Sequence, residues 1–291
     1  MKKIALTSLL AVFAISGAHA ANVIDGNPLY MPAQNHFYSV TDLYSHTGEH
    51  ANGDKQIKDW TLSEEFGYGV MDNLAINLRT ALHEEQGFDD YSMGDLGFKV
   101  TYRALDMGAW KADLFGEFAI DGGSIFDHVK KNDEGKKETY WFDEEHNMYN
   151  WTAGIRGGYT TSLFTVAGRV EFTYTNTESF NWGDEGMHTW TFGLDGQYVI
   201  NDDWNLVGTV EYKGVSSDKT EIYGVEYDIK NAGRWFGEFG VNYNIDATKY
   251  VGLYINGTMN HWKGDDLEEA HKKGWGFEEG FGFGAKFGID F

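Results

Sequence analysis

Hydrophobic and polar residues alternate over the last seventeen residues of the chain, from Trp275 to Phe291. One set of alternate positions carries mostly aromatic side chains, and the other carries mostly glycine. A period of two is the geometry of a β-strand, whose successive side chains point to opposite faces of a sheet. An aromatic face backed by a nearly bare face fits a wall between lipid and a lumen better than a soluble sheet. The segment therefore predicts a membrane-spanning strand.

The same alternation recurs along the chain from His36 onward. In one segment, for example, Phe98 and Val100 alternate with Lys99 and Thr101. Single-chain bacterial barrels have an even number of strands. We therefore predict an all-β fold, a transmembrane antiparallel up-and-down β-barrel of about 12 strands. The predicted strands are 36–46, 56–70, 74–84, 94–105, 110–121, 148–160, 163–177, 188–200, 204–215, 233–245, 250–262 and 275–291.

The connections between these segments alternate in length. Short connections are rich in residues that favour turns, and the longest of the others are 122–147 and 216–234. Outer-membrane barrels have short periplasmic turns and longer outer loops. We therefore expect the tight connections on the periplasmic side, at Met71 to Asn73, Asp106 to Ala109, Thr161 to Ser162, Asn201 to Asp203 and Asp246 to Lys249.

The N-terminus has the features of a secretory signal peptide. Lys2 and Lys3 precede an apolar run, and small residues before Ala21 form a cleavage site. The run is shorter than the roughly 20 residues that a spanning helix needs. The predicted organisation is a signal peptide at 1–20, a periplasmic lead-in at 21–35 that contains the two prolines of the chain, and the barrel at 36–291.

Both ends of the mature chain resemble known proteins. The terminal Phe291, with Phe287 and Ile289 before it, resembles the C-terminal assembly signal of bacterial outer-membrane β-barrels. This resemblance implies export to the outer membrane of a Gram-negative bacterium and recognition by the barrel-assembly machinery. The run NPLYMP at 27–32 followed by HFYS at 36–39 is similar to the opening of outer-membrane channel proteins of the MetA-pathway (phenol degradation) type.

Composition agrees with a barrel in lipid. The chain contains 37 glycines, 16% aromatic residues and no cysteine, and its mean hydropathy is negative. A helical membrane protein would be more apolar, and a disulfide-stabilised secreted domain would contain cysteine. Loss of Lys2 and Lys3 with the signal peptide changes the net charge from −22 to −24. This charge disfavours nucleic acid as a partner and attracts cations.

Tryptophan positions indicate which face meets lipid. Eight of the ten tryptophans lie at predicted strand ends on the apolar parity or at its edge. Amphipathic rings at both ends of spanning strands form the aromatic girdles of a membrane wall, in contact with lipid and lipopolysaccharide. The predicted girdle consists of Trp60, Trp110, Trp151, Trp190, Trp204, Trp235, Trp262 and Trp275.

The opposite parity then lines a lumen. A barrel of about 12 strands lies between the filled interior of eight strands and the open pore of sixteen, so a narrow channel for small polar or ionic solutes is the leading interpretation. Charged side chains of both signs would set its selectivity. The predicted lumen residues are Arg79, Lys99, Arg103, Lys111, Asp113, Glu117, Arg156, Arg169, Glu171, Asp195, Glu211, Lys213, Glu238, Glu278 and Lys286, and the inward glycines of the last strand would clear space beside them.

Two other functions remain open. The same charges could pair across a plugged interior, leaving a structural or adhesive surface protein whose outer loops carry the function. A barrel enzyme of the lipase or protease type is a third interpretation, but the chain has no cysteine and no GxSxG element. We therefore expect no enzyme activity, no cofactor and no metal site.

One segment conflicts with a simple barrel. On 56–70 the parity that directs Leu62 and Phe66 to lipid also directs Glu64 there. An unpaired carboxylate in lipid is unfavourable. We therefore expect the face formed by 36–70 to be covered by another subunit or to contain a local irregularity.

Overall fold

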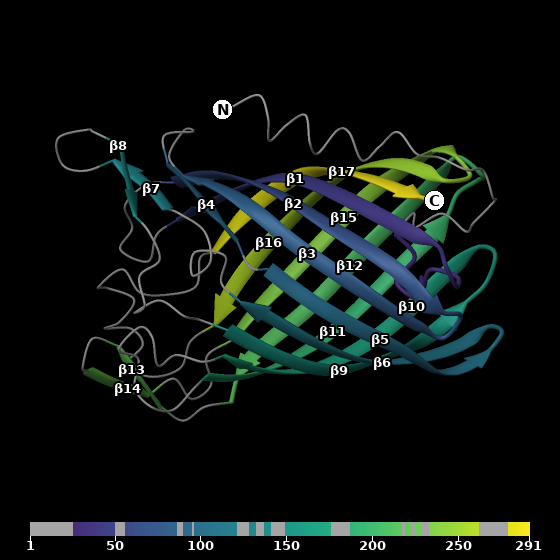
Figure 1. Cartoon of the computed structure of the whole chain (residues 1–291), viewed down its shortest axis with the longest axis horizontal. Helices are drawn as coiled ribbons and strands as arrows, with labels where there is room; N and C mark the ends of the chain where they lie inside the picture. The colour runs from purple at the N-terminus through teal and green to yellow at the C-terminus, as the bar shows by residue number, and fades with distance from the viewer. Residues whose placement is uncertain are drawn as a thin grey trace.

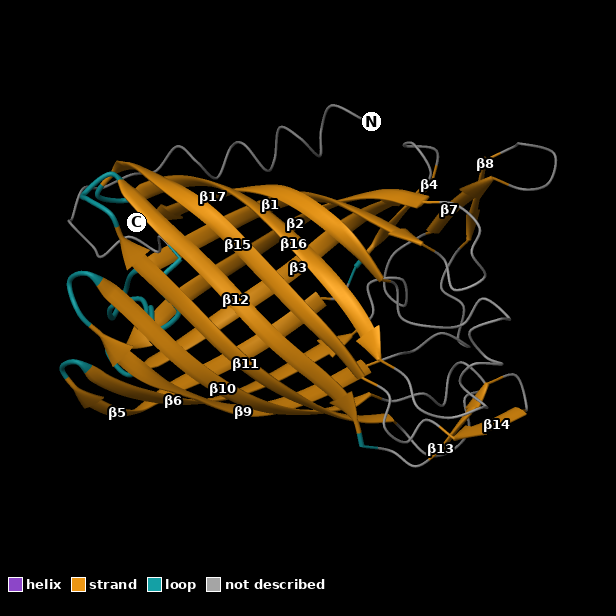
Figure 2. Ribbon diagram, turned by 180° about the vertical axis from the view of Figure 1, so that it is seen from behind, coloured by secondary structure: helices purple, strands orange, loops and turns teal. Residues whose placement is uncertain are grey.

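A computed structural model of the chain shows a closed antiparallel β-barrel of twelve long strands (Figures 1 and 2). The structure describes residues 26–49, 56–85, 90–94, 96–120, 128–131, 137–140, 149–175, 187–216, 219–222, 225–228, 233–261 and 279–291. The barrel strands are β1 (Phe37–Glu49), β2 (Gln56–Met71), β3 (Leu74–Glu85), β5 (Leu96–Met107), β6 (Trp110–Ile120), β9 (Tyr149–Thr160), β10 (Phe164–Thr175), β11 (Met187–Val199), β12 (Trp204–Val215), β15 (Gly233–Asp246), β16 (Lys249–His261) and β17 (Glu279–Asp290).

The first and last strands close the barrel. β1 and β17 pair antiparallel from Tyr38 opposite Asp290 to Glu49 opposite Glu279. Beyond this ladder, Phe37 and Phe291 exchange two backbone hydrogen bonds of 2.7 and 2.9 Å. Closure leaves no strand edge, which is the condition for a sheet to cross lipid. The predicted fold class is confirmed, and each predicted strand overlaps one strand of the barrel.

The two ends of the barrel differ, as the loop lengths predicted. Tight turns, the chain terminus Phe291 and residues 26–36 lie at one end, which we call the turn end. At the other end, the loop end, short additional strands extend beyond the barrel (Figure 1). These are β4 (Asp90–Met93), β7 (His128–Lys131), β8 (Lys137–Tyr140), β13 (Lys219–Ile222) and β14 (Val225–Asp228). The predicted signal peptide lies outside the described residues, among which no helix is long and apolar enough to cross a membrane.

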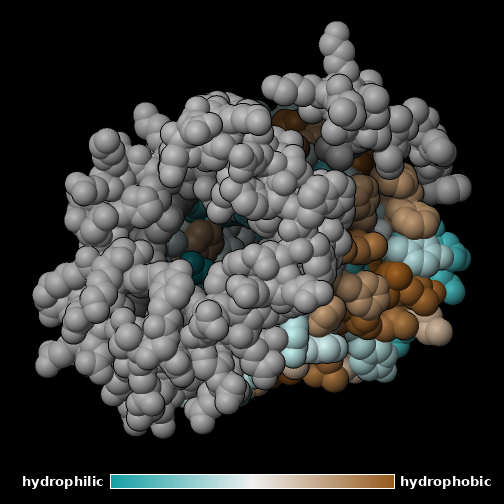
Figure 3. Space-filling model, turned by 60° about the vertical axis from the view of Figure 1, so that its left-hand side comes forward, coloured by the Kyte–Doolittle hydropathy of each residue, from teal (hydrophilic) through white to brown (hydrophobic). Residues whose placement is uncertain are grey.

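The outer wall of the barrel is apolar. Leu194 on β11 is 57% exposed and Leu253 on β16 is 70% exposed, although both are large aliphatic side chains. Figure 3 shows a band of such residues on the outside of the barrel. Because exposure on this scale would be costly in water, the outer wall matches lipid.

Tryptophans lie at both ends of this wall. Trp110 and Trp204 are the first residues after tight turns, whereas Trp151, Trp190 and Trp235 lie near the loop ends of their strands. All five are exposed, and each packs against an aromatic ring of a neighbouring strand. The structure thus places five members of the predicted girdle in two belts. Trp60 packs edge-on against Phe283 at 5.8 Å, and Trp262 and Trp275 lie outside the described residues.

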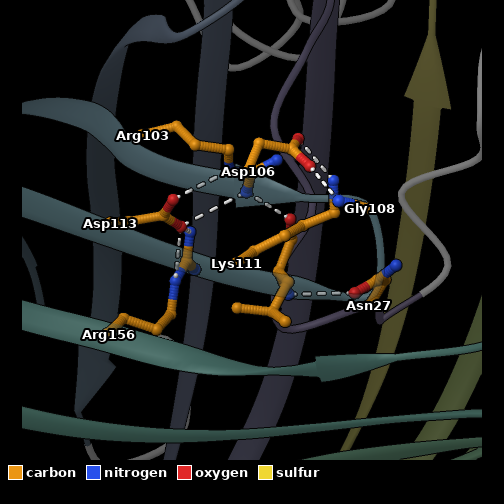
Figure 4. A network of polar contacts seen from close by, with 8 residues as sticks. Asn27, Arg103, Asp106, Gly108, Lys111, Asp113 and Arg156 are labelled. Carbon is orange, nitrogen blue, oxygen red and sulfur yellow. Dashed lines mark hydrogen bonds and ion pairs between the residues drawn. The ribbon is translucent and has the colours of Figure 1, made fainter.

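The turn between β5 and β6 contains an exposed group of hydrogen bonds at the turn end (Figure 4). Gly108 has a φ of 74°, a conformation that glycine adopts without strain. Asp106 accepts hydrogen bonds from Lys111 Nζ at 2.7 Å and from the Gly108 N–H at 3.0 Å. These two bonds stabilise the ionised carboxylate, so they lower the pKa of Asp106.

Two adjacent glycines on β9 allow a matched test of strand packing. A Cβ on Gly158 would lie well inside contact distance of the Val166 carbonyl oxygen, whereas a Cβ on Gly157 would meet no atom closer than 3.5 Å. We expect Gly158→Ala to lower the free energy of unfolding by about 1–3 kcal/mol through overpacking. Gly157→Ala should change it by less than about 1 kcal/mol. Urea unfolding of the two variants in the same lipid checks this, and equal stabilities would contradict it.

The inward glycines of β17 do not widen the lumen as predicted. A Cβ on Gly284 would overlap the ring of Tyr254, and one on Gly288 would overlap the ring of Tyr250. Both tyrosines come from β16, and their rings occupy the space beside the glycine backbone. The space beside these two glycines is therefore filled by tyrosine rings from the neighbouring strand.

Candidate functional site

A polar cavity occupies the interior of the barrel. Its volume is about 780 Å³. Charged side chains of both signs line it, and its polar character contrasts with the apolar outer wall. The basic residues are Arg79, Lys99, Arg156, Arg169, Lys213 and Lys286, and the acidic residues are Asp42, Glu65, Glu117, Glu171, Asp195, Glu211 and Glu238.

Most of the predicted lumen residues lie around this cavity. Those in contact with it are Arg79, Lys99, Glu117, Arg156, Arg169, Glu171, Asp195, Glu211, Lys213, Glu238 and Lys286. Arg103 and Asp113 lie in the interior next to the lining residue Arg156. Lys111 pairs with Asp106 at the turn end, and Glu278 lies outside the described residues.

Arg169 on β10 pairs with three carboxylates of the cavity wall. Its Nη1 lies 2.5 Å from Asp195 on β11, its Nε lies 3.2 Å from Glu171, and its Nη2 pairs with Glu211 on β12. A planar guanidinium can serve several carboxylates at once because its five N–H groups form a fixed fork. All four side chains are between 13% and 23% exposed. This Arg169 cluster is therefore partly accessible from the cavity.

A second cluster is more deeply buried. Asp113 on β6 lies directly opposite Arg103 on β5 and Arg156 on β9. Its carboxylate accepts hydrogen bonds from Arg103 Nε at 2.9 Å and from Arg156 Nη2 at 2.6 Å (Figure 4). The side chain of Asp113 is 0% exposed, and that of Arg103 is 8% exposed. Strand register therefore brings three predicted lumen residues, Arg103, Asp113 and Arg156, together in an interior triad.

Lys286 joins the two ends of the chain across the lumen wall. Its Nζ lies 2.7 Å from Glu238 on β15 and 4.0 Å from Asp42 on β1. Asp42 also accepts a hydrogen bond of 2.7 Å from Tyr254 on β16. The ammonium of Lys286 lies 4.2 Å from the centre of the Tyr254 ring. The last strand is therefore held to its neighbours by polar contacts inside the barrel as well as by its backbone.

Residues 26–36, before β1, lie inside the mouth at the turn end, in a stretch that the sequence predicted to be mostly a periplasmic lead-in. This segment contains no strand. Leu29 is 2% exposed, and its carbonyl oxygen accepts a hydrogen bond of 2.6 Å from Arg103 Nη2. The hydroxyl of Tyr30 donates to Asp290 at 2.5 Å. Gly26 and Pro28 line the cavity, so this segment forms part of its floor.

Sequence reasoning missed several interior residues. Asp42 and Glu65 line the cavity but were not among the predicted lumen residues. Glu65 lies next to the conflicting Glu64 on β2, and Asp42 lies on the neighbouring strand β1. The alternation of Glu65 with Phe66 and Glu64 would have placed it inward. No periodic signal marks Tyr30 or Leu29, because the lead-in is not a strand.

The structure gives a local explanation for Glu64 on the outer face of β2. The carboxylate accepts a hydrogen bond of 2.5 Å from Ser39 and one of 2.6 Å from Thr41, both on β1. Two hydroxyl donors replace part of the hydration that a carboxylate loses in lipid. These two hydrogen bonds, from hydroxyls of the same chain, therefore offset part of the free-energy cost of placing the Glu64 carboxylate in lipid.

Comparison with solved structures identifies the same architecture elsewhere. An outer membrane channel from Pseudomonas putida F1 is similar with a TM-score of 0.59 at 13% sequence identity, covering 93% of this chain and 100% of that chain. The NanC porin is similar with a TM-score of 0.57 at 8% identity, covering 86% of this chain and 98% of that chain. At these identities the likeness shows a shared outer-membrane barrel fold. No protein-family model and no curated protein sequence matches the chain, so the MetA-pathway resemblance stays a prediction.

Proposed function

We propose that the protein is a channel of the Gram-negative outer membrane through which small polar or ionic solutes pass. The observation that carries this proposal is a charged cavity of about 780 Å³ inside a wall whose outer face is apolar. Water and ions are stable beside such a lining, whereas lipid is stable against the outer face. The similarity to an outer membrane channel and to a porin supports the proposal at the level of the fold.

The charges suit solutes that carry polar or charged groups rather than apolar ones. Basic and acidic side chains both line the wall, and several of them are paired with each other. A solute that enters must exchange hydrogen bonds with these groups, so a purely apolar molecule would leave them unsatisfied. The proposal includes the outer-membrane location and the partners of the barrel. Lipid and lipopolysaccharide contact the outer wall, and the assembly machinery recognises the last strand. The 36–70 face is available to a second subunit.

The alternative is a plugged structural barrel whose outer loops carry the function. The lead-in within the mouth is the observation that favours it. Conduction separates the two functions, because a structural barrel needs no continuous water path.

Single-channel recording tests the channel directly. We expect discrete conductance steps, and we expect Lys213→Glu, in the cavity wall, to raise the cation-over-anion permeability ratio by about threefold or more, because it reverses one charge beside the ion path. Lys249→Glu is the control, since Lys249 pairs with Asp246 at the exposed turn end. Reversal potentials in a salt gradient measure the ratio. A folded barrel that stays silent with and without residues 26–32 would overturn the channel.

A further inference from the structure

Residues 26–35, the described part of the lead-in, cross the barrel from one wall to the opposite one. At one end of this segment, a Cβ on Gly26 would lie 2.5 Å from Val207 on β12 and 2.8 Å from Asn242 on β15. Three residues later, the Leu29 carbonyl oxygen bonds to Arg103 on β5. β5 and β15 are six positions apart in the closed ring of twelve strands, so they lie diametrically opposite each other. The segment between these contacts therefore spans the interior.

Further contacts extend around the ring. Tyr30 bonds to Asp290 on β17, and the Ala33 carbonyl lies where a side chain on Gly69 of β2 would be. The N–H of Asn35 donates to the Gly69 carbonyl at 2.8 Å. The path from Gly26 to Asn35 thus touches strands on several sides of the barrel. A segment confined to one side would leave an open path, whereas this one crosses it.

The crossing segment has a defined local fold. Asn27 accepts hydrogen bonds from the Leu29 N–H through its side chain at 2.9 Å and from the Tyr30 N–H through its backbone at 3.0 Å. Proline at the following position has a fixed φ that suits a turn. Leu29 is 2% exposed and Pro32 is buried. The segment is therefore a compact turn inserted into the mouth.

The bonds that hold this turn are separate from the ladder that closes the barrel. Its anchors are Arg103 and Asp290, each of which contacts it through a side chain. The β1–β17 and β1–β2 ladders begin after the turn, at Tyr38 and Phe37. Withdrawal of the turn would therefore leave the barrel closed as a sheet and would open its mouth.

We propose that residues 26–32 form a plug at the turn end and that passage of a solute requires the plug to leave the mouth. This proposal rests on the proposed channel function. The plug closes one end of the cavity, whose floor includes Gly26 and Pro28. Loss of the bond to Arg103 or to Asp290 should raise the fraction of time for which the mouth is open, because fewer bonds then hold the plug in place.

Single-channel recording compares native protein, a variant that lacks residues 26–32, and Tyr30→Phe. We expect the deletion to raise the conductance several-fold, and we expect Tyr30→Phe to raise the open fraction without changing the size of the open step. Tyr254→Phe is the matched control, because it removes the same kind of bond, from a tyrosine to the carboxylate of Asp42, away from the plug. Retained heat-modifiable migration shows that each barrel is folded.

The outcomes separate the two proposals. A deletion variant that conducts like the native protein, with the same open fraction, overturns the plug and leaves the channel intact. Silence of every folded variant overturns the channel and the plug together. An equal effect of Tyr30→Phe and Tyr254→Phe also contradicts the plug.

A second readout does not require conduction. The chain contains no cysteine, so single cysteines can report accessibility to a membrane-impermeant maleimide. We expect Leu29→Cys to react much more slowly than Ala33→Cys, because Leu29 is buried and Ala33 is exposed. Adding Tyr30→Phe should accelerate labelling of Leu29→Cys. Equal rates at the two positions would show that the turn does not occupy the mouth.

Discussion

Replacing Asp113 by asparagine is expected to lower the free energy of unfolding by about 3–5 kcal/mol, the cost of removing one partner from a buried ion pair. The carboxylate is fully buried between Arg103 and Arg156, at 2.9 and 2.6 Å. Asparagine preserves the volume but leaves two guanidinium groups without a counter-charge in a place with little water. Urea unfolding in lipid vesicles, followed by tryptophan fluorescence, measures the loss.

Asp106→Asn provides the control for this prediction. Asp106 also pairs with a cation, Lys111 at 2.7 Å, but its side chain is 47% exposed. Exposed pairs contribute about 0–1 kcal/mol, because water already solvates both charges. The two substitutions thus make the same chemical change in the same hairpin at different depths. Equal losses of unfolding free energy for Asp113→Asn and Asp106→Asn would show that burial does not determine how much the Asp113 triad stabilises the barrel.

Replacing Arg169 by glutamine is expected to raise the cation-over-anion permeability ratio by about tenfold, which corresponds to about 1.4 kcal/mol. The substitution removes the cation that pairs with Glu171, Asp195 and Glu211. Unit charges 4 Å apart interact by about 4 kcal/mol at an effective dielectric constant of 20. Water in the cavity weakens this interaction energy, so we take about a third of it as the expected change in selectivity. The unpaired carboxylates then attract cations and repel anions.

Reversal potentials in a salt gradient test this expectation in the open channel. Arg79→Gln is the comparison, because Arg79 pairs with the single carboxylate of Glu117 at 2.6 Å and its side chain is 53% exposed. It removes the same charge from the same cavity but leaves fewer carboxylates unpaired. A shift for Arg169→Gln no larger than that for Arg79→Gln would contradict the role of the cluster.

The strands could be predicted because lipid and water impose opposite demands on alternate residues. Phe98 and Val100 must face outward while Lys99 and Thr101 face inward, and this requirement marks a strand without reference to any neighbour. The prediction for β17 rests on the same rule at its strongest. The tight turns also have their own signal, in residues such as Asp106 and Gly108.

Pairing inside the barrel could not be predicted in this way. Parity places Arg169 and Glu211 in the lumen, but they lie two strands apart, and only strand register determines that they meet. Register also decides that Asp113 lies between two arginines and that Tyr254 covers Gly284. A shift of two residues between strands would preserve every inward and outward assignment and change all of these contacts.

The sequence by itself therefore determined the barrel, the apolar outer wall and the identity of most lumen residues, because the two solvents act on each residue separately. The tertiary structure decided which charges pair and where the lead-in lies. Residues 26–36 have no periodicity that would assign them to either solvent, and their position depends on contacts with Arg103, Asp290 and Gly69 from distant parts of the chain. Such contacts exist only after the ring of strands has closed.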